Sequence, residues 1–271
     1  MQVINGLWEL MPLRMWKSLL PDRIAFYGHV ISDRNLPQGA RYRYPGFREL
    51  EEFLANLRDL GYAFVSYPEF LAGGGGGRKA LLSFDDGFAE IRSELHPYLK
   101  SRGIPYMVFI LGQPCAEPGF VMEPFHSLPL ATKPAHLGRA DIEALAADGV
   151  AIGYHTRTHF RVAQGTPVDD PRLRSELIPD ADVDSLLTRP KAFAYPFMAP
   201  RDFASYDALL AEAGFKAFFD TKGMRDADGA HVFRVPMDLG VGQRGGNCLL
   251  ANLKRCLKSR LAAPFKSLEP A

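Results

Sequence analysis

Two adjacent carboxylates are the first residues in this sequence that suggest chemistry. Asp85 and Asp86 follow the run Lys-Ala-Leu-Leu-Ser-Phe at 79–84, which is typical of a buried strand, and precede Gly87. Both acids therefore stand at the carboxyl end of a strand, where strand–helix folds bind ligands. Neighbouring carboxylates repel each other unless a cation or a proton lies between them. A metal bound by one acid, with the other acting as a base, explains the pair; a simple Asp-Asp-Gly turn is the alternative.

Two histidines four residues apart follow another predicted strand. His155 and His159 come directly after the apolar run at 150–154. This spacing places both imidazoles on one face of a helical turn, where they can bind one metal. The alternative is an ordinary pair of surface or core histidines. Together with one aspartate, the two histidines would form a ligand set with open positions for water, suited to Zn, Ni, Co or Fe.

The elements that must position these residues alternate between strand and helix. Apolar runs predict strands at 23–30, 62–66, 79–84, 105–111, 150–154, 192–195, 216–219 and 232–235. Helical spacing predicts helices at 47–60, 91–99, 141–148, 173–187, 203–213 and 249–261. With no internal repeat or low-complexity linker, this pattern predicts an α/β fold: one barrel-like domain of about seven strand–helix units. The long segment 112–139 has no clear period, and we interpret it as a lid or cleft wall.

Composition narrows the class of protein. The chain has 271 residues, 47% hydrophobic and 23% charged, as in a soluble globular protein, and its net charge of +1 gives no indication of a nucleic-acid partner. The three cysteines are too few for a disulfide framework and are interpreted as free thiols. No signal peptide or transmembrane run is visible, so we expect a cytoplasmic protein.

The first 22 residues form an apolar segment ahead of a domain at 23–271. Residues 7–20 carry both tryptophans and a few basic residues. This stretch predicts either a short helix packed on the domain or peripheral contact with a membrane surface.

Three motifs resemble those of the polysaccharide deacetylases, carbohydrate esterase family four. They are Ser-Phe-Asp-Asp-Gly at 83–87, His-Thr-x-x-His at 155–159 and Phe-Ala-Tyr-Pro-Phe at 193–197, and the resemblance spans roughly 24–240. It implies a deformed (β/α) barrel of about seven strands that holds a divalent metal between one aspartate and two histidines. Of the metals that suit these ligands, we expect Zn before Ni, Co or Fe.

The resemblance also implies roles for individual residues. The general base would be Asp85, and the backbone N–H of Phe197 would help to bind the oxyanion. Substrate would contact Tyr195 and Pro196. The metal ligands would be Asp86, His155 and His159.

The acid that protonates the leaving amine is expected near the N-terminus. No Leu-x-His motif occurs late in the chain, but Phe-Tyr-Gly-His-Val at 26–30 resembles the Tyr-His-x-Val segment of a circularly permuted branch that includes poly-N-acetylglucosamine deacetylases. His29 is then the candidate acid. The extra Gly28 is unusual for that branch, and a structural histidine at a strand end is the alternative.

An arginine of the family's third motif is replaced here by Ala194. Because a catalytic carboxylate needs a fixed orientation, we expect another guanidinium to take this role. Arg234, at the end of the last strand, is the first candidate, and Arg157 is its rival. The remaining histidines, which match no motif, are expected at the surface or in loops: His96, His126, His136 and His231.

The predicted function is metal-dependent hydrolysis of an N-acetyl group on an amino sugar in a glycan or glycan precursor. One alternative is an amidase or deformylase acting on a non-sugar or formylated substrate. Another is a non-catalytic sugar-binding relative. The intact Asp85–Asp86 and His155–His159 pairs argue against it, since a binding module has no need for both acids. The sequence predicts no oligomeric state.

Overall fold

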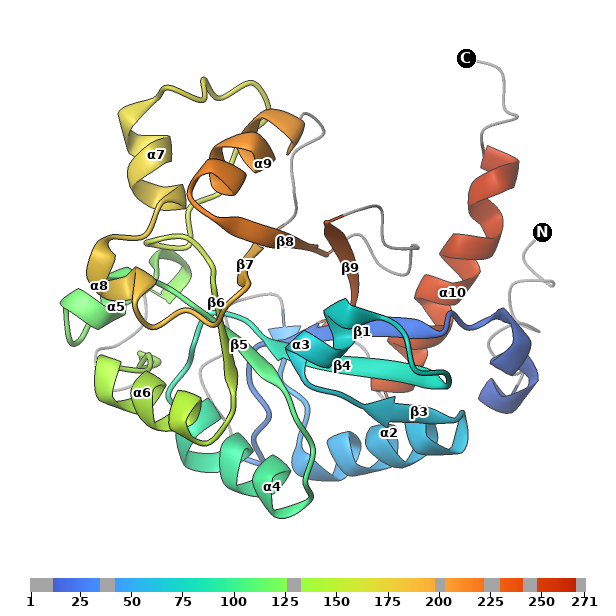
Figure 1. Cartoon of the computed structure of the whole chain (residues 1–271). Coiled ribbons are helices and arrows are strands. Elements are labelled where there is room, and N and C mark those ends of the chain that lie inside the picture. The colour runs from blue at the N-terminus through green and yellow to red at the C-terminus, as the bar shows by residue number, and fades with distance from the viewer. Residues whose placement is uncertain are drawn as a thin grey trace.

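Seven parallel strands form a closed barrel in the part of the chain that the structure describes (Figure 1). This computed structural model describes residues 12–34, 42–125, 133–197, 203–221, 230–240 and 248–266. The barrel strands are β1 (Arg23–Gly28), β4 (Arg78–Phe84), β5 (Met107–Ile110), β6 (Ala151–Tyr154), β7 (Lys191–Ala194), β8 (Phe215–Asp220) and β9 (His231–Pro236).

The order of the strands closes the barrel through its N-terminal strand. From β4 to β9 each strand pairs with the next in the sequence, and β1 lies between β9 and β4. A further strand, β3 (Tyr62–Phe64), pairs in parallel with the beginning of β4. The predicted (β/α) barrel of about seven strands is therefore confirmed.

Helices cover the outside of the barrel (Figure 1). The α-helices are α2 (Phe47–Asp59), α3 (Tyr67–Ala72), α4 (His96–Ser101), α5 (Gln113–Ala116), α6 (Arg139–Ala147), α7 (Pro171–Leu177), α8 (Ala181–Asp184), α9 (Phe203–Glu212) and α10 (Cys248–Lys266). One turn of π-helix (Ile91–Leu95) leads into α4, and a 3₁₀ helix lies at Glu123–Phe125. A short antiparallel pair joins β2 (Tyr42–Arg43) to β10 (Leu239–Gly240).

The apolar stripe of α2 shows how the sequence directs this packing. Leu50, Phe53, Leu54 and Leu57 recur at helical spacing and are all buried against the barrel. The helix ends just before Gly61, whose positive φ of 89° suits a residue without a side chain.

The barrel interior combines small and large apolar side chains. Five alanines from four strands belong to this inner cluster, together with eight larger apolar residues. The alanines are Ala25, Ala151, Ala192, Ala194 and Ala217. Because alanine fills little volume, the barrel retains room for one long side chain, that of Arg234, which is fully buried.

The N-terminal segment is described only from residue 12. It contains a 3₁₀ helix, Leu13–Leu19, whose Trp16 is buried in the same core as α2, while Met15 is exposed. Residues 1–11 lie outside the described ranges, so membrane contact through this segment stays a prediction. Within those ranges, none of the helices combines the length and apolarity needed to cross a bilayer.

The long segment predicted at 112–139 does form part of a cleft wall. Met122 and Phe125 pack with Val30, Phe88 and Leu111 in a small apolar cluster separate from the main core. Met122, Phe125 and Phe88 also line the pocket described below. Residues 126–132, and with them His126, lie outside the described part of the chain.

Candidate metal and catalytic site

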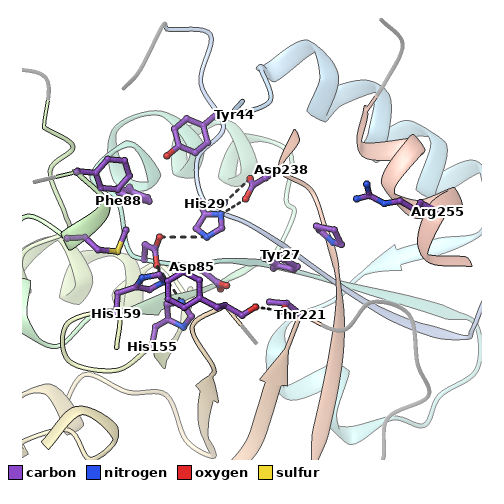
Figure 2. A pocket seen from close by; sticks show the side chains of 15 residues that line it. Tyr27, His29, Tyr44, Asp85, Phe88, His155, His159, Thr221, Asp238 and Arg255 are labelled. Atoms are coloured by element: carbon purple, nitrogen blue, oxygen red, sulfur yellow. Dashed lines mark hydrogen bonds and ion pairs between the residues drawn. The ribbon is translucent and has the colours of Figure 1, made fainter. Parts of the chain in front are cut away.

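Side chains from several strands converge at the carboxyl end of the barrel (Figure 2). They surround a pocket of about 290 Å³. Asp85 and Asp86 follow β4, His155 follows β6, and His29 follows β1. The common polarity of the parallel strands brings these segments to the same edge.

Three of these side chains form a compact ligand set. The ligand atoms of Asp86, His155 and His159 all lie within 4.8 Å of one another. Asp86 Oδ1 lies 3.5 Å from His155 Nε2 and 3.3 Å from His159 Nε2. Two ligands each about 2.1 Å from a tetrahedral metal stand about 3.4 Å apart, so these distances fit one ion. Asp86 Oδ1 is buried without a hydrogen-bond partner, which a bound cation would supply.

The hydrogen bond of His155 determines which nitrogen can bind a metal. His155 Nδ1 lies 2.7 Å from the carbonyl oxygen of Ala194, so the proton belongs on Nδ1 and the lone pair on Nε2. Burial lowers the pKa of His155 to about 4 and that of His159 to about 3. Both imidazoles are therefore neutral at pH 7, as metal binding requires.

Glu176 of α7 positions the loop between the two histidines. Its buried carboxylate accepts hydrogen bonds from the N–H of Thr158 at 2.9 Å and from its hydroxyl at 2.7 Å. The backbone N–H of Arg157 donates to the Glu176 carbonyl at 3.0 Å. Sequence reasoning missed Glu176, because no motif marks it.

Left-handed backbone is concentrated at this site. Within the described ranges, the residues other than glycine with a positive φ are Asp86, Thr156, His159 and Phe197, with values of 66–68°. All four are ligands or lie beside ligands. Such a conformation is disfavoured for most side chains and persists where the surroundings determine it. Here it directs two ligands toward the same point.

Asp85 is held by an arginine from β9, which is separated from β4 by β1 in the barrel. Arg234 Nη1 and Nη2 donate to the two carboxylate oxygens of Asp85 at 2.6 and 2.8 Å, and Nη1 also donates to Ser83 Oγ at 2.9 Å. Although burial alone would raise the pKa of Asp85, the Arg234 charge holds it below its usual range. The contact predicted for Arg234 is present. The rival Arg157 instead donates to Gln113 Oε1 at 2.7 Å.

His29 forms a pair with Asp238, which sequence reasoning did not identify. His29 Nδ1 contacts Asp238 Oδ2, and the His29 N–H donates to Asp238 Oδ1 at 3.2 Å (Figure 2). The other ring nitrogen, Nε2, faces Asp86 Oδ2 at 3.7 Å. Although burial opposes the charge, the carboxylates of Asp238 and Asp86 raise the pKa of His29 to about 10. His29 is therefore protonated at neutral pH in this structure.

Phe197 offers a backbone donor at the pocket. Its carbonyl accepts from Thr221 Oγ1 at 2.6 Å, whereas its N–H has no acceptor within the described residues. Its ring lies 4.7 Å from that of His159.

Two residues predicted to contact substrate do not line the pocket. Tyr195 and Pro196 are both buried, and the Tyr195 hydroxyl donates to Asp207 of α9 at 2.5 Å. Tyr195 therefore attaches α9 to the end of β7 and does not face the pocket. The alternation of side chains along a strand explains the difference: Ala194 points into the barrel and Tyr195 points out.

The expectation for the unassigned histidines was wrong for His96 and His231, which are both buried. His96 bonds Tyr106 and Asp148 at 2.9 and 2.8 Å. His231 bonds Asp207 at 2.5 Å. His231 thus joins β9 to α9, and His96 of α4 bonds one residue just before β5 and one just after α6. His136, which is partly buried, stacks on Phe88 and bonds the Asp86 carbonyl at 2.9 Å.

The rest of the pocket is largely apolar. Tyr44, Phe88, Met122 and Phe125 form one wall, and Arg255 of α10 lines another part (Figure 2). Aromatic faces beside a few polar groups suit a sugar ring, which has apolar faces and hydroxyl edges.

Comparison with known proteins gives consistent results. Residues 72–218, more than half of the chain, match the family model described as polysaccharide deacetylase. Comparison with curated proteins gave no significant match.

Several solved structures share the fold. IcaB from Ammonifex degensii is 23% identical with a TM-score of 0.62, over 86% of this chain and 97% of that one. A de-N-acetylase from Aggregatibacter actinomycetemcomitans is 17% identical with a TM-score of 0.64, over 85% and 99%. The deacetylase PplD from Streptococcus pyogenes is 16% identical with a TM-score of 0.63, over 85% and 97%.

Proposed function

The chain belongs to the polysaccharide deacetylase family, and we propose that it hydrolyses the N-acetyl group of an amino sugar in a glycan or glycan precursor, using a divalent metal. One observation carries this proposal. An Asp86–His155–His159 ligand set with two neutral imidazoles lies beside a second carboxylate, Asp85, which is bound by an arginine and lies outside that set. A sugar-binding module has no use for this combination.

The ligand set would hold the ion through Asp86 Oδ1 and the Nε2 atoms of the two histidines. Its donors, two imidazoles and one carboxylate, suit Zn²⁺ and also accept Ni²⁺, Co²⁺ or Fe²⁺. When bound, the metal supplies Lewis acidity toward the amide carbonyl and lowers the pKa of a bound water.

Asp85 acts as the general base in this proposal. Its carboxylate is ionised and held on both oxygens by Arg234, so it keeps one orientation toward the ligand set. It takes the proton of the attacking water. The N–H of Phe197 then donates to the oxyanion that forms on the amide carbonyl.

His29 acts as the general acid. The amine is a poor leaving group until it is protonated, and the acid must approach from a side other than that of the base. His29 reaches the pocket from β1, and Asp238 fixes its ring through Nδ1. The proton on Nε2 is therefore directed into the pocket.

The test combines metal analysis with product analysis. Purified protein should contain one equivalent of a divalent metal per chain and release acetate from N-acetylglucosamine oligomers, whereas Asp86→Asn should lose both. Release of formate from N-formyl analogues without acetate from N-acetyl ones would indicate a deformylase. Sugar binding without any release would indicate a non-catalytic relative, and either result would contradict the proposal.

A further inference from the structure

A second pocket adjoins the first on the far side of His159. It has a volume of about 340 Å³ and shares Met122, His159 and Phe197 with the first pocket. Thr158, Phe160, Arg161 and Arg172 complete most of its wall, together with Glu123. A ligand long enough to occupy both pockets therefore passes His159 and Phe197.

Two guanidinium groups line this second pocket, each lying over an aromatic ring. The Arg161 Cζ lies 4.2 Å from the ring centre of Phe197, and the Arg172 Cζ lies 5.2 Å from that of Phe160. Stacking of this kind holds the guanidinium plane in place while leaving its N–H groups free to bond within that plane. Planar forks of this kind match the geometry of carboxylate and phosphate groups.

Neither arginine is neutralised within the described residues. Arg161 and Arg172 form no ion pair there, although Glu123 lines the same pocket. The nearby Asp170 is used to cap α7, and Glu176 is bonded to Thr158. The described lining of this pocket thus carries two cations and one anion.

We propose that the second pocket binds an anionic substituent, a carboxylate or a phosphate ester, on the unit attached to the sugar that is deacetylated. This inference rests on the proposed function, because it places the N-acetylated unit in the first pocket. It adds a substrate class: the preferred glycan or precursor carries negative charge next to the reacting residue. A neutral homopolymer of N-acetylglucosamine would leave both guanidinium groups without a partner.

The test uses three matched disaccharides on the metal-loaded protein. N-acetylglucosamine is joined to glucose, to glucuronic acid, or to glucose 6-phosphate. The three substrates therefore compare a neutral neighbouring sugar with one that carries a carboxylate and one that carries a phosphate. We expect a higher kcat/KM for one or both acidic substrates than for the neutral one. The preference is the kcat/KM for the acidic substrate divided by that for the neutral one. Arg161→Gln and Arg172→Gln should each lower this ratio about threefold to tenfold, the effect of losing one charged hydrogen bond near solvent.

Arg174→Gln is the matched control, because Arg174 is exposed on the same helix, α7, and does not line the pocket. It should leave the ratio unchanged. The metal content of each variant is measured alongside, because Phe160 and Phe197, on which the two guanidinium groups stack, lie beside His159. Equal kcat/KM values for all three substrates, or a preference that survives both substitutions, would overturn the proposal.

A separate measurement distinguishes failure of this inference from failure of the proposed function. If none of the disaccharides releases acetate, calorimetry of their binding to the same proteins still compares acidic with neutral ligands. Tighter binding of an acidic disaccharide that is lost in Arg172→Gln supports the anion subsite on its own. Equal binding of all three contradicts it.

Discussion

Arg234 and Asp85 form a bidentate ion pair inside the barrel, with Nη–Oδ distances of 2.6 and 2.8 Å across 149 residues of sequence. The guanidinium also lies 4.8 Å from the ring centre of Tyr27 and 5.1 Å from that of Phe109. Both charges are largely removed from bulk water, since Arg234 is 0% and Asp85 2% exposed, although Asp85 reaches the pocket. Each charge therefore depends on the other.

Arg234→Met should destabilise the protein strongly. It leaves the buried Asp85 carboxylate without its cation, which typically costs about 3–5 kcal/mol in the free energy of unfolding. Denaturant unfolding of the metal-free protein measures this. The double variant Arg234→Met with Asp85→Asn should recover part of the loss, because no uncompensated charge remains. A double variant as unstable as the sum of the two singles would contradict the coupling.

Asp85→Asn should separate catalysis from metal binding. The variant should lose about 100-fold or more in turnover, because an amide cannot accept the proton of water. Its metal content should stay near that of the wild type, since Asp85 is outside the ligand set. Elemental analysis beside acetate release checks both, and loss of the metal would mean that the two aspartates exchange roles.

Metal should stabilise the wild-type protein and not Asp86→Asn. A ligand that binds only the folded state raises its stability, by about 2.7 kcal/mol at a free concentration 100 times Kd. Thermal unfolding with and without added Zn²⁺ measures the shift in Tm. An equal shift in both proteins would place the ion elsewhere.

Glu176→Ala should weaken metal binding although Glu176 is not a ligand. The variant removes both acceptors of the Thr158 bonds, so the loop carrying His159 is no longer fixed. Loss of such a supporting residue typically lowers metal affinity about 10- to 100-fold. A competition titration with a chromophoric chelator measures the affinity. Glu176→Gln keeps one acceptor oxygen and should fall between Glu176→Ala and the wild type; unchanged affinity in both variants would contradict the role.

His29→Ala should discriminate between leaving groups. Turnover of an N-acetyl substrate should fall about 100-fold or more, because its amine needs a proton. An activated acetate ester, whose leaving group needs none, should be hydrolysed at nearly the wild-type rate. Asp238→Asn should show the same selectivity with a smaller loss, because the imidazole remains but is less well oriented. Equal losses on amide and ester would exclude His29 as the acid.

The local features of the site could be predicted from the sequence. Asp85, Asp86 and His155 stand directly after strands, and His159 follows His155 by four residues, so strand polarity brings them to one end of the barrel. Each of these residues lies in a short motif with a fixed spacing. Their convergence at one end could therefore be predicted, but the expected helical turn was wrong: residues 155–159 are not helical, and Glu176 holds their loop instead.

The supporting contacts were harder to predict because they join segments far apart in the sequence. Asp238 meets His29 across 209 residues, and only the pairing of β1 with β9 brings them together. Arg234 could be predicted because Ala194 replaces the arginine of a known motif, so another arginine was expected. No missing motif residue pointed to Asp238 or Glu176. Tyr195 was misassigned because its motif gives its neighbours along the chain but not the face of the strand on which it lies.

The closure of the barrel by β1 also has a consequence for the newly made chain. The three ligand residues lie at 86–159, in the middle of the sequence, whereas His29 precedes them and its partner Asp238 follows. At about 5–20 residues per second, a ribosome adds Asp238 roughly 10–40 s after His29. The ligand residues are therefore made well before Arg234 and Asp238, which orient the base and the acid. The pairing of β9 with β1 is thus the folding step that completes the catalytic residues around the ligand set.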